Sequence, residues 1–162
     1  MGVDLIELSG GSYEAPAMHG QARDGRTLAR EAYFLEFAKD IAKMAHMPIM
    51  VTGGIRRYPV VEQVLGSGIA MAGMGTALAI DPQLPKAWLA DRSASPLLRA
   101  ITWKNKVLSS IAYMAMVKYQ LRRLSQGKHT RPNVAPALAL LMQQLETKVR
   151  NWQYRRMMRS GL

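Results

Sequence analysis

MPIMVTGGIRR, residues 47–57, is the stretch that decides the fold of this chain. Its apolar run at residues 48–51 shows no alternation, which predicts a strand covered on both faces, as in a parallel sheet. Gly53 and Gly54 end that strand. Two glycines there allow positive φ and a close approach of a ligand to the backbone, so the N–H groups of this turn are predicted to make an anion site.

The same unit of strand, glycine turn and helix recurs on both sides of this stretch. Downstream, Pro59 suits the first turn of a helix, and a second apolar run at residues 69–72 leads into the turn Gly73-Met74-Gly75-Thr76. Upstream, residues 2–8 are predicted to form a strand, followed by a long loop and a helix. The apolar side of that helix is predicted to consist of Phe34, Phe37, Ala38, Ile41 and Met44.

Strand, loop and helix in regular succession are typical of α/β proteins, in which the loops after the strands carry the chemistry. Three segments resemble the old yellow enzyme family, namely VDLIELSGGSYE, REAYFLEFAKDIAKMAHMPIMVTGGIRR and GMGTALAIDPQLP. They are similar to the sixth, seventh and eighth strand-helix units of that family, whose members are FMN-dependent NAD(P)H oxidoreductases. The resemblance covers roughly residues 2–89 and implies the last three βα units of a TIM-type (β/α)8 barrel.

The resemblance also implies a cofactor site, because the family holds the FMN phosphate with main-chain groups after its last two strands. The matching positions here are Gly53, Gly54, Gly75 and Thr76. Family members usually have a Gly-Arg pair at the last turn, so this chain lacks one charge-assisted phosphate contact there. Arg56 or Arg57 is the candidate to compensate. No residue matches the catalytic positions of the family.

In the reaction that the resemblance implies, FMN takes a hydride from NADH or NADPH and passes it to an electron-poor alkene. A closed barrel of this type needs about 250 residues. We therefore interpret the chain as the carboxyl-terminal part of such an enzyme, whose partner is the missing amino-terminal barrel portion. By the resemblance, that portion carries the groups that hold the flavin ring and the substrate, so the isolated chain is not expected to be a complete oxidoreductase.

Charge divides the chain into two predicted domains. Residues 1–96 carry 9 Lys or Arg and 10 Asp or Glu, whereas residues 97–162 carry 13 and 1. The first domain is the partial barrel with the phosphate site. The second is predicted to be a basic helical hairpin, with one helix from Ser95-Pro96 to about Leu124 and another from Pro136 to about Met158.

The basic hairpin leaves three interpretations open: a solvated face, contact with an anionic membrane surface, or contact with nucleic acid phosphates. If it provides the function, the chain is a non-catalytic basic helical protein, and the barrel part serves only as a folding platform. Tyr13, Glu14 and His19 lie on the long loop after the first strand, where a barrel enzyme places substrate contacts. A simple loop is the alternative.

Other signals in the sequence are weaker. Gly73-x-Gly75 is similar to a dinucleotide-binding fingerprint, but Leu78 stands at the third glycine position and the next helix is predicted only from Asp81. The histidines His19, His46 and His129 share no metal-ligand spacing.

Composition bears on location. The absence of cysteine excludes disulfides and thiolate metal sites, and the early apolar run does not resemble a signal peptide because charged residues interrupt it. The longest uncharged apolar stretch, residues 107–117, is shorter than the roughly 20 residues that cross a bilayer. The cytoplasm is the predicted location.

Overall fold

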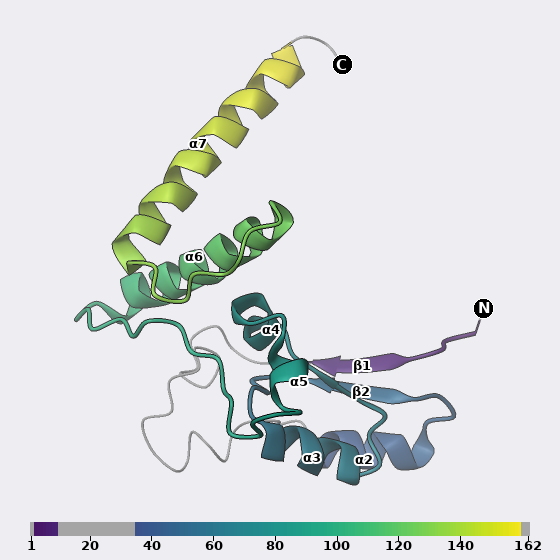
Figure 1. The fold of residues 1–162 in the computed structure, drawn as a ribbon. Helices are drawn as coiled ribbons and strands as arrows, with labels where there is room; N and C mark the ends of the chain where they lie inside the picture. Colours follow the sequence, from purple (N-terminus) through teal and green to yellow (C-terminus); the bar gives the residue numbers. More distant parts are fainter. Residues whose placement is uncertain (1, 10–34, 160–162) are drawn as a thin grey trace. The chain divides into compact units, whose positions relative to one another are not determined.

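The computed structural model describes residues 2–9 and 35–159. Contacts between residues divide the chain into two compact units, Met1–Leu97 and Leu98–Leu162. Figure 1 shows the helices and strands of both units along the chain. Tyr13, Glu14 and His19, which were considered for substrate contacts, lie outside the described part of the chain.

The first unit is built on a parallel sheet whose three described strands are β1 (Ile6–Ser9), β2 (Ile49–Thr52) and β3 (Met71–Gly73). They lie side by side in chain order, so that Leu8 is opposite Val51 and Val51 is opposite Ala72. The helices α2 (Leu35–Met44) and α3 (Tyr58–Gly66) lie between successive strands in the chain and cover the same face of the sheet (Figure 1). This arrangement of parallel βα units confirms the predicted α/β class.

The core of the first unit lies between this sheet and its two helices. Val51 on β2, Ala38 on α2 and Val64 on α3 are each 0% exposed. Burial alternates along β2, because Val51 faces the helices whereas Met50 and Thr52 face the other way and are half-buried. Among the described residues, β2 is therefore fully covered on the face that packs against the helices and only half covered on the other face, so the prediction of a strand covered on both faces is confirmed for one face.

Two predicted strand boundaries are wrong. The first strand begins at Ile6 instead of Gly2, because the N–H of Ile6 donates to the carbonyl of Pro48 (3.1 Å) and Pro48 has no N–H with which to extend the ladder. The third strand begins at Met71 instead of Ile69 and includes Gly73. Both strands are therefore short and end at the same edge of the sheet.

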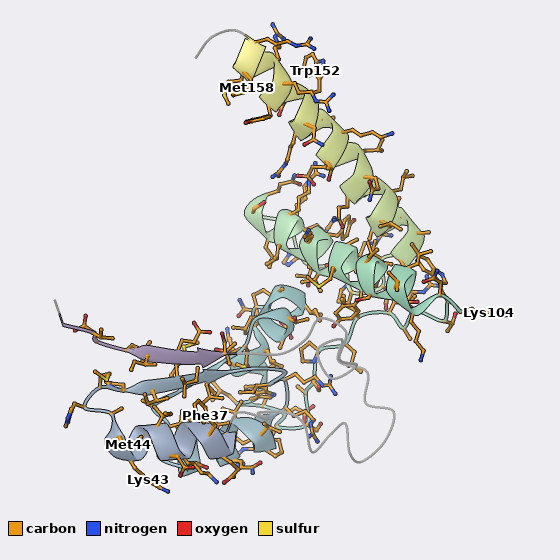
Figure 2. All side chains as sticks on the ribbon, turned by 180° about the vertical axis from the view of Figure 1, so that it is seen from behind. Phe37, Lys43, Met44, Lys104, Trp152 and Met158 are labelled. Carbon is orange, nitrogen blue, oxygen red and sulfur yellow. The ribbon has the colours of Figure 1, made fainter. Side chains whose placement is uncertain are left out.

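The predicted apolar side of α2 is also wrong in part. Phe37 is 55% exposed and Met44 is 71% exposed, and both side chains project from the helix in Figure 2. Ala38 is buried as predicted, together with Leu35, which was not part of the prediction. The buried stripe thus lies about one residue round the helix from the predicted one. Phe34 lies outside the described residues.

Two short helices, α4 (Thr76–Ile80) and α5 (Leu84–Ala87), follow β3. The expectation that the next helix would wait until Asp81 is wrong, because the N–H of Ala79 donates to the carbonyl of Gly75 (3.0 Å) and closes a helical turn at once. The segment ends on Trp88, whose ring packs edge-on against Tyr58 with 5.6 Å between centroids. The indole N–H of Trp88 donates to the carbonyl of Ala94 (2.8 Å). The ring contact packs Trp88 against the start of α3, and the hydrogen bond holds the segment that follows Trp88.

The turn after Trp88 provides a test by titration. The hydroxyl and the backbone N–H of Ser93 both donate to the Asp91 carboxylate (2.6 and 2.8 Å) and lower its pKa below the ordinary 3.8. The lowered pKa means that these bonds stabilise the fold above pH 3.8, and that the stabilisation is lost as pH falls through the lower folded value. We expect Ser93→Ala to raise the Asp91 midpoint, measured by NMR of its carboxyl carbon.

Asp40 is the internal control for this titration, because its pKa is lowered by a hydrogen bond from Lys43 and not by Ser93. Its midpoint should stay unchanged in the Ser93→Ala variant. An Asp91 midpoint that does not move would contradict the hydrogen bond from the Ser93 hydroxyl.

The second unit contains the helices α6 (Lys106–Ser125) and α7 (Pro136–Arg159). The predicted start of the first of these helices, at Ser95-Pro96, is wrong by about three turns. Asn105 caps α6, since its side chain accepts a hydrogen bond from the N–H of Leu108 (2.9 Å). The N–H of Arg99 donates to the carbonyl of Pro132 (3.1 Å), which holds the segment before α6 in a loop contact.

The predicted hairpin is not observed. The connection between the helices runs back toward the start of α6, as the bond between Arg99 and Pro132 requires. Arg122, near the end of α6, then forms an ion pair with Glu146, in the middle of α7 (3.2 Å). Both helices consequently run in the same general direction (Figure 1). No helix among the described residues is long and apolar enough to cross a membrane.

Candidate functional site

The predicted site residues come together at one edge of the sheet. Thr52, the last residue of β2, pairs in register with Gly73, the last residue of β3. The segments that follow, residues 53–57 and 74–76, therefore leave the sheet from adjacent positions. Parallel α/β sheets bind ligands at this edge, where the carboxyl ends of the strands and their loops lie.

The glycine turn after β2 has the backbone that was predicted. Gly53 and Gly54 both have positive φ, at 158° and 66°. Gly54 is in the left-handed region that side chains other than glycine rarely adopt. The turn is followed by Ile55, which is 3% exposed and anchors it in the core.

Arg56, the predicted charge partner of an anion, is only 9% exposed. Arginine is almost never this buried in proteins unless its charge is paired. Arg57, the alternative candidate, lies directly before α3. The structure thus places a buried cation within three residues of the glycine turn.

The two glycines after Ala72 have different roles. A Cβ built at Gly73 would overlap Thr52 Oγ1 and would lie 2.5 Å from Met50 Cε. A Cβ built at Gly75 would meet no heavy atom within 4 Å, and φ there is −79°. Gly73 is therefore required by packing, whereas Gly75 leaves open space beside Thr76 at the edge where the glycine turn begins.

Thr52 was missed by sequence reasoning. Its Oγ1 is buried and has no hydrogen-bond partner in the part of the chain that the structure describes. A buried hydroxyl without a partner costs free energy, about 1–3 kcal/mol. Only the packing of β2 against β3 shows this, because threonine is an ordinary residue of a strand.

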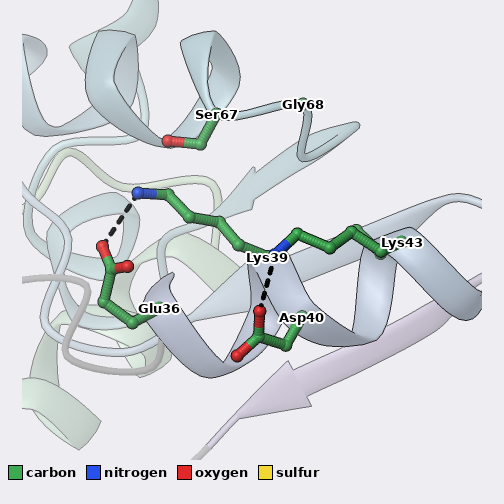
Figure 3. A pocket seen from close by; sticks show the side chains of 7 residues that line it. Glu36, Lys39, Asp40, Lys43, Ser67 and Gly68 are labelled. Carbon is green, nitrogen blue, oxygen red and sulfur yellow. Dashed lines mark hydrogen bonds and ion pairs between the residues drawn. The ribbon is translucent and has the colours of Figure 1, made fainter.

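A shallow hollow of about 380 Å³ lies elsewhere in the first unit (Figure 3). It is lined by residues of α2 together with Ser67 and Gly68, which lead into the amino end of β3. Lys39 is paired with Glu36 (2.8 Å) and Lys43 with Asp40 (2.9 Å), as the dashed lines in Figure 3 show. The hydrogen bond that Lys43 donates to Asp40 raises the pKa of Lys43. The charges are matched, so the hollow lacks the excess of positive charge that would select an anion.

No group of three or more His, Asp or Glu among the described residues is arranged to hold a metal ion. The geometry therefore points to the strand ends, where the glycine turn, the buried Arg56 and the space at Gly75 adjoin.

Comparison with known proteins identifies the family to which the surrounding fold belongs. A family model described as "Histidine biosynthesis protein" matches residues 26–124. The chain belongs to the histidine biosynthesis protein family.

This family is of the TIM-barrel type, which agrees with the parallel βα units of the first unit. Which units of a barrel this histidine biosynthesis family member contributes stays a prediction. The old yellow enzyme family is not the one whose model matches, so that part of the resemblance rests on individual relatives.

Two such relatives of this histidine biosynthesis family member are named NADH-dependent flavin oxidoreductase iliE. The chain is 39% identical over 94 residues to that of Neonectria sp. (strain DH2), covering 52% of this chain and 12% of that protein. It is 38% identical over 91 residues to that of Hypocrea jecorina (strain QM6a), covering 52% of this chain and 23% of that protein. These names agree with the predicted oxidoreductase class.

A third relative carries a different name. The chain is 36% identical over 75 residues to a phosphoribosyl imidazole-4-carboxamide isomerase of Dehalococcoides mccartyi (strain CBDB1), covering 46% of this chain and 30% of that protein. The chain spans less than a third of the length of each of these relatives.

Proposed function

We propose that this chain provides the phosphate-binding end of an FMN-dependent, NADH-using flavin oxidoreductase of old yellow enzyme type. The observation that carries the proposal is the open space at Gly75, which adjoins the glycine turn at the carboxyl edge of the sheet. The names of the flavin oxidoreductase relatives support the reaction class.

The residues at this edge fit a phosphate group. Main-chain N–H groups of Gly53, Gly54, Gly75 and Thr76 supply donors, and glycine lets an anion approach them closely. Arg56 adds a fixed positive charge near the turn, which offsets the absence of an arginine after Gly75. When bound, FMN would carry a hydride from NADH to an electron-poor alkene. The role of this chain is to hold and orient the phosphate end of that cofactor.

The groups that contact the flavin ring and the substrate belong, in this proposal, to the missing amino-terminal barrel portion. The described residues of the first unit supply three of the eight strands that a closed barrel requires. We accordingly assign no catalytic residue to this chain.

A second candidate is favoured by the family match and by the phosphoribosyl isomerase relative. A phosphoribosyl compound presents the same phosphate monoester chemistry as FMN but no flavin ring. The same edge of the sheet would then hold the phosphate of a sugar substrate. The two candidate ligands share the phosphate and differ in the group attached to it, a flavin in one and a sugar in the other, so binding of each ligand separates the two functions.

The test uses Gly75→Ala, in which the added methyl group occupies the open space without a clash. We expect the variant to bind FMN roughly tenfold more weakly than the parent chain, the loss that corresponds to one hydrogen bond to a charged group. The quenching of flavin fluorescence measures the affinity. Riboflavin, which lacks the phosphate, should bind both proteins equally weakly, because the groups that contact the flavin ring belong to the missing portion in this proposal.

Gly66→Ala is the matched control, because a Cβ there also meets no heavy atom within 4 Å and Gly66 is the last residue of α3. It should leave FMN affinity unchanged. Equal FMN binding by Gly75→Ala and its parent would remove the last turn from the phosphate site. Direct binding of ribose 5-phosphate measured by calorimetry, with no measurable FMN binding, would favour the second candidate.

A further inference from the structure

The second unit carries an apolar stripe that the described residues of that unit leave uncovered. Along α7 the side chains share a spacing of three or four residues and are between 45% and 60% exposed. They are Leu138, Leu141, Leu145, Val149 and Trp152. This spacing places them along one side of a helix over about four turns. We call them the α7 stripe.

Contact with α6 uses a different side of α7. Ala139 is 1% exposed, and Glu146 pairs with Arg122 of α6 (3.2 Å). These two residues are seven positions apart, two turns of the helix, and so share a side that excludes the α7 stripe. The stripe is therefore not part of the packing between the two helices.

The far end of α7 is strongly basic. Residues 147–159 contain five Lys or Arg and no Asp or Glu. Lys148 and Arg155, seven residues apart, run along one border of the α7 stripe, and Arg156, four residues after Trp152, continues its line. Every residue from 147 to 159 is exposed. Glu146, the carboxylate that precedes them, is occupied by Arg122 and Arg150.

We propose that α7 docks on an anionic lipid bilayer through the α7 stripe and its flanking cations. In an interfacial helix the apolar side enters the boundary between headgroups and acyl chains, while Lys and Arg reach the anionic headgroups. Trp152, at the end of the stripe and 60% exposed, is the residue type that favours this boundary (Figure 2). Arg156 can extend its charged head past the apolar layer, because long basic side chains do so readily.

Charge and shape argue against two other occupants. A second copy of α7 would offer Lys148, Arg155 and Arg156 no carboxylate, because the one acid of the helix, Glu146, is already paired with Arg122 and Arg150. Nucleic acid would contact the cations but would leave the α7 stripe exposed to water. A bilayer with anionic headgroups both buries the apolar side chains of the α7 stripe and pairs with the flanking cations.

The experiment is flotation of the full chain with vesicles of phosphatidylcholine, alone or with 30% phosphatidylserine, at two salt concentrations. We expect at least tenfold stronger binding to the anionic vesicles, weakened by salt. The variant Leu141→Gln/Leu145→Gln/Trp152→Gln should bind roughly 30-fold more weakly, since each large apolar side chain contributes several-fold to partitioning. The variant Arg155→Gln/Arg156→Gln/Arg159→Gln should bind anionic vesicles roughly 100-fold more weakly, because each of the three cations near the surface contributes about fivefold.

Two control variants match these changes outside the proposed surface. Gln144→Ala/Asn151→Ala alters exposed positions of α7 that lie away from the stripe, and Lys104→Gln/Lys106→Gln/Lys128→Gln removes the same charge from other segments. Both should retain vesicle binding within about threefold, and circular dichroism checks that all variants keep α7.

The proposal is overturned by any of three results. These are no flotation with anionic vesicles, equal loss in the control variants, or binding to a DNA or RNA duplex in place of vesicles. Light scattering that finds a dimer whose formation requires the α7 stripe would assign the surface to a second copy instead.

Discussion

Replacing Gly73 with alanine is expected to destabilise the first unit by roughly 2–4 kcal/mol, the upper range for forcing extra volume into a packed site. The added Cβ would overlap Thr52 Oγ1 and lie 2.5 Å from Met50 Cε. Met50 Cε is the end of a flexible side chain and can move aside, but Thr52 Oγ1 and Cβ (3.0 Å) lie next to the backbone of β2, whose residues pair in register with β3. The strands would have to separate or shift, and the two loops of the candidate site would shift with them.

Urea unfolding followed by tryptophan fluorescence measures the effect. Trp88 is the tryptophan of the first unit, so a background with Trp103→Phe and Trp152→Phe makes it the sole reporter. Gly66→Ala in the same background should change the midpoint little, since nothing lies within 4 Å of a Cβ there.

A rescue experiment tests the cause of the Gly73→Ala effect. Thr52→Ala removes the overlapping hydroxyl, so the double variant should recover part of the lost stability. Thr52→Ala alone should cost little, because the hydroxyl that it removes is buried without a hydrogen-bond partner among the described residues. A Gly73→Ala variant as stable as its parent would show that the strand ends are looser than described.

The sheet could be predicted from sequence because its signal is local. An apolar run such as residues 49–51, ended by two glycines, is specific for a buried strand that leads into a loop. The left-handed backbone of Gly54 follows from the same two glycines. The strand boundaries could not be predicted, because β1 begins where its neighbour presents Pro48, and that neighbour is more than 40 residues away along the chain.

Helix faces and directions depended on packing that the sequence pattern leaves open. The apolar residues of α2 at helical spacing span more of the helix than the sheet covers, and only contact with the sheet buries Ala38 while it leaves Phe37 exposed. Pro96 is a plausible helix start by residue type, yet Asn105 holds that role because the segment before it is held by the loop at Pro132. The reversal of that loop, and with it the direction of α7, depends on long-range hydrogen bonds.

The candidate site also combines features that the sequence predicts with features that only the packing of the fold reveals. Glycines at strand ends are visible in the sequence, but the difference between Gly73, which packing requires, and Gly75, which leaves space, appears only when β2 lies beside β3. The burial of Arg56 is equally a property of the fold. Residue types thus identify where a phosphate could bind, and packing decides which of those residues are free to bind it.

Replacing Gln120 with leucine is expected to destabilise the second unit by about 2–4 kcal/mol. Gln120 is 0% exposed, and its amide makes two bonds to the backbone of Arg131: Nε2 donates to the carbonyl (3.0 Å) and Oε1 accepts from the N–H (2.6 Å). Leucine fills nearly the same volume but leaves both backbone groups unpaired, and each unpaired buried group costs about 1–3 kcal/mol.

This pair of bonds holds the returning loop against α6 and thereby sets where α7 begins. Gln120→Leu should therefore lower the thermal midpoint and abolish the slow hydrogen exchange of the Arg131 N–H. Gln144→Leu, at an exposed position of α7, is the matched control and should change neither. Retained protection of the Arg131 N–H in the Gln120 variant would mean that the loop is held by its other contacts, chiefly the bonds from Arg99 to Pro132 and from Arg123 to His129.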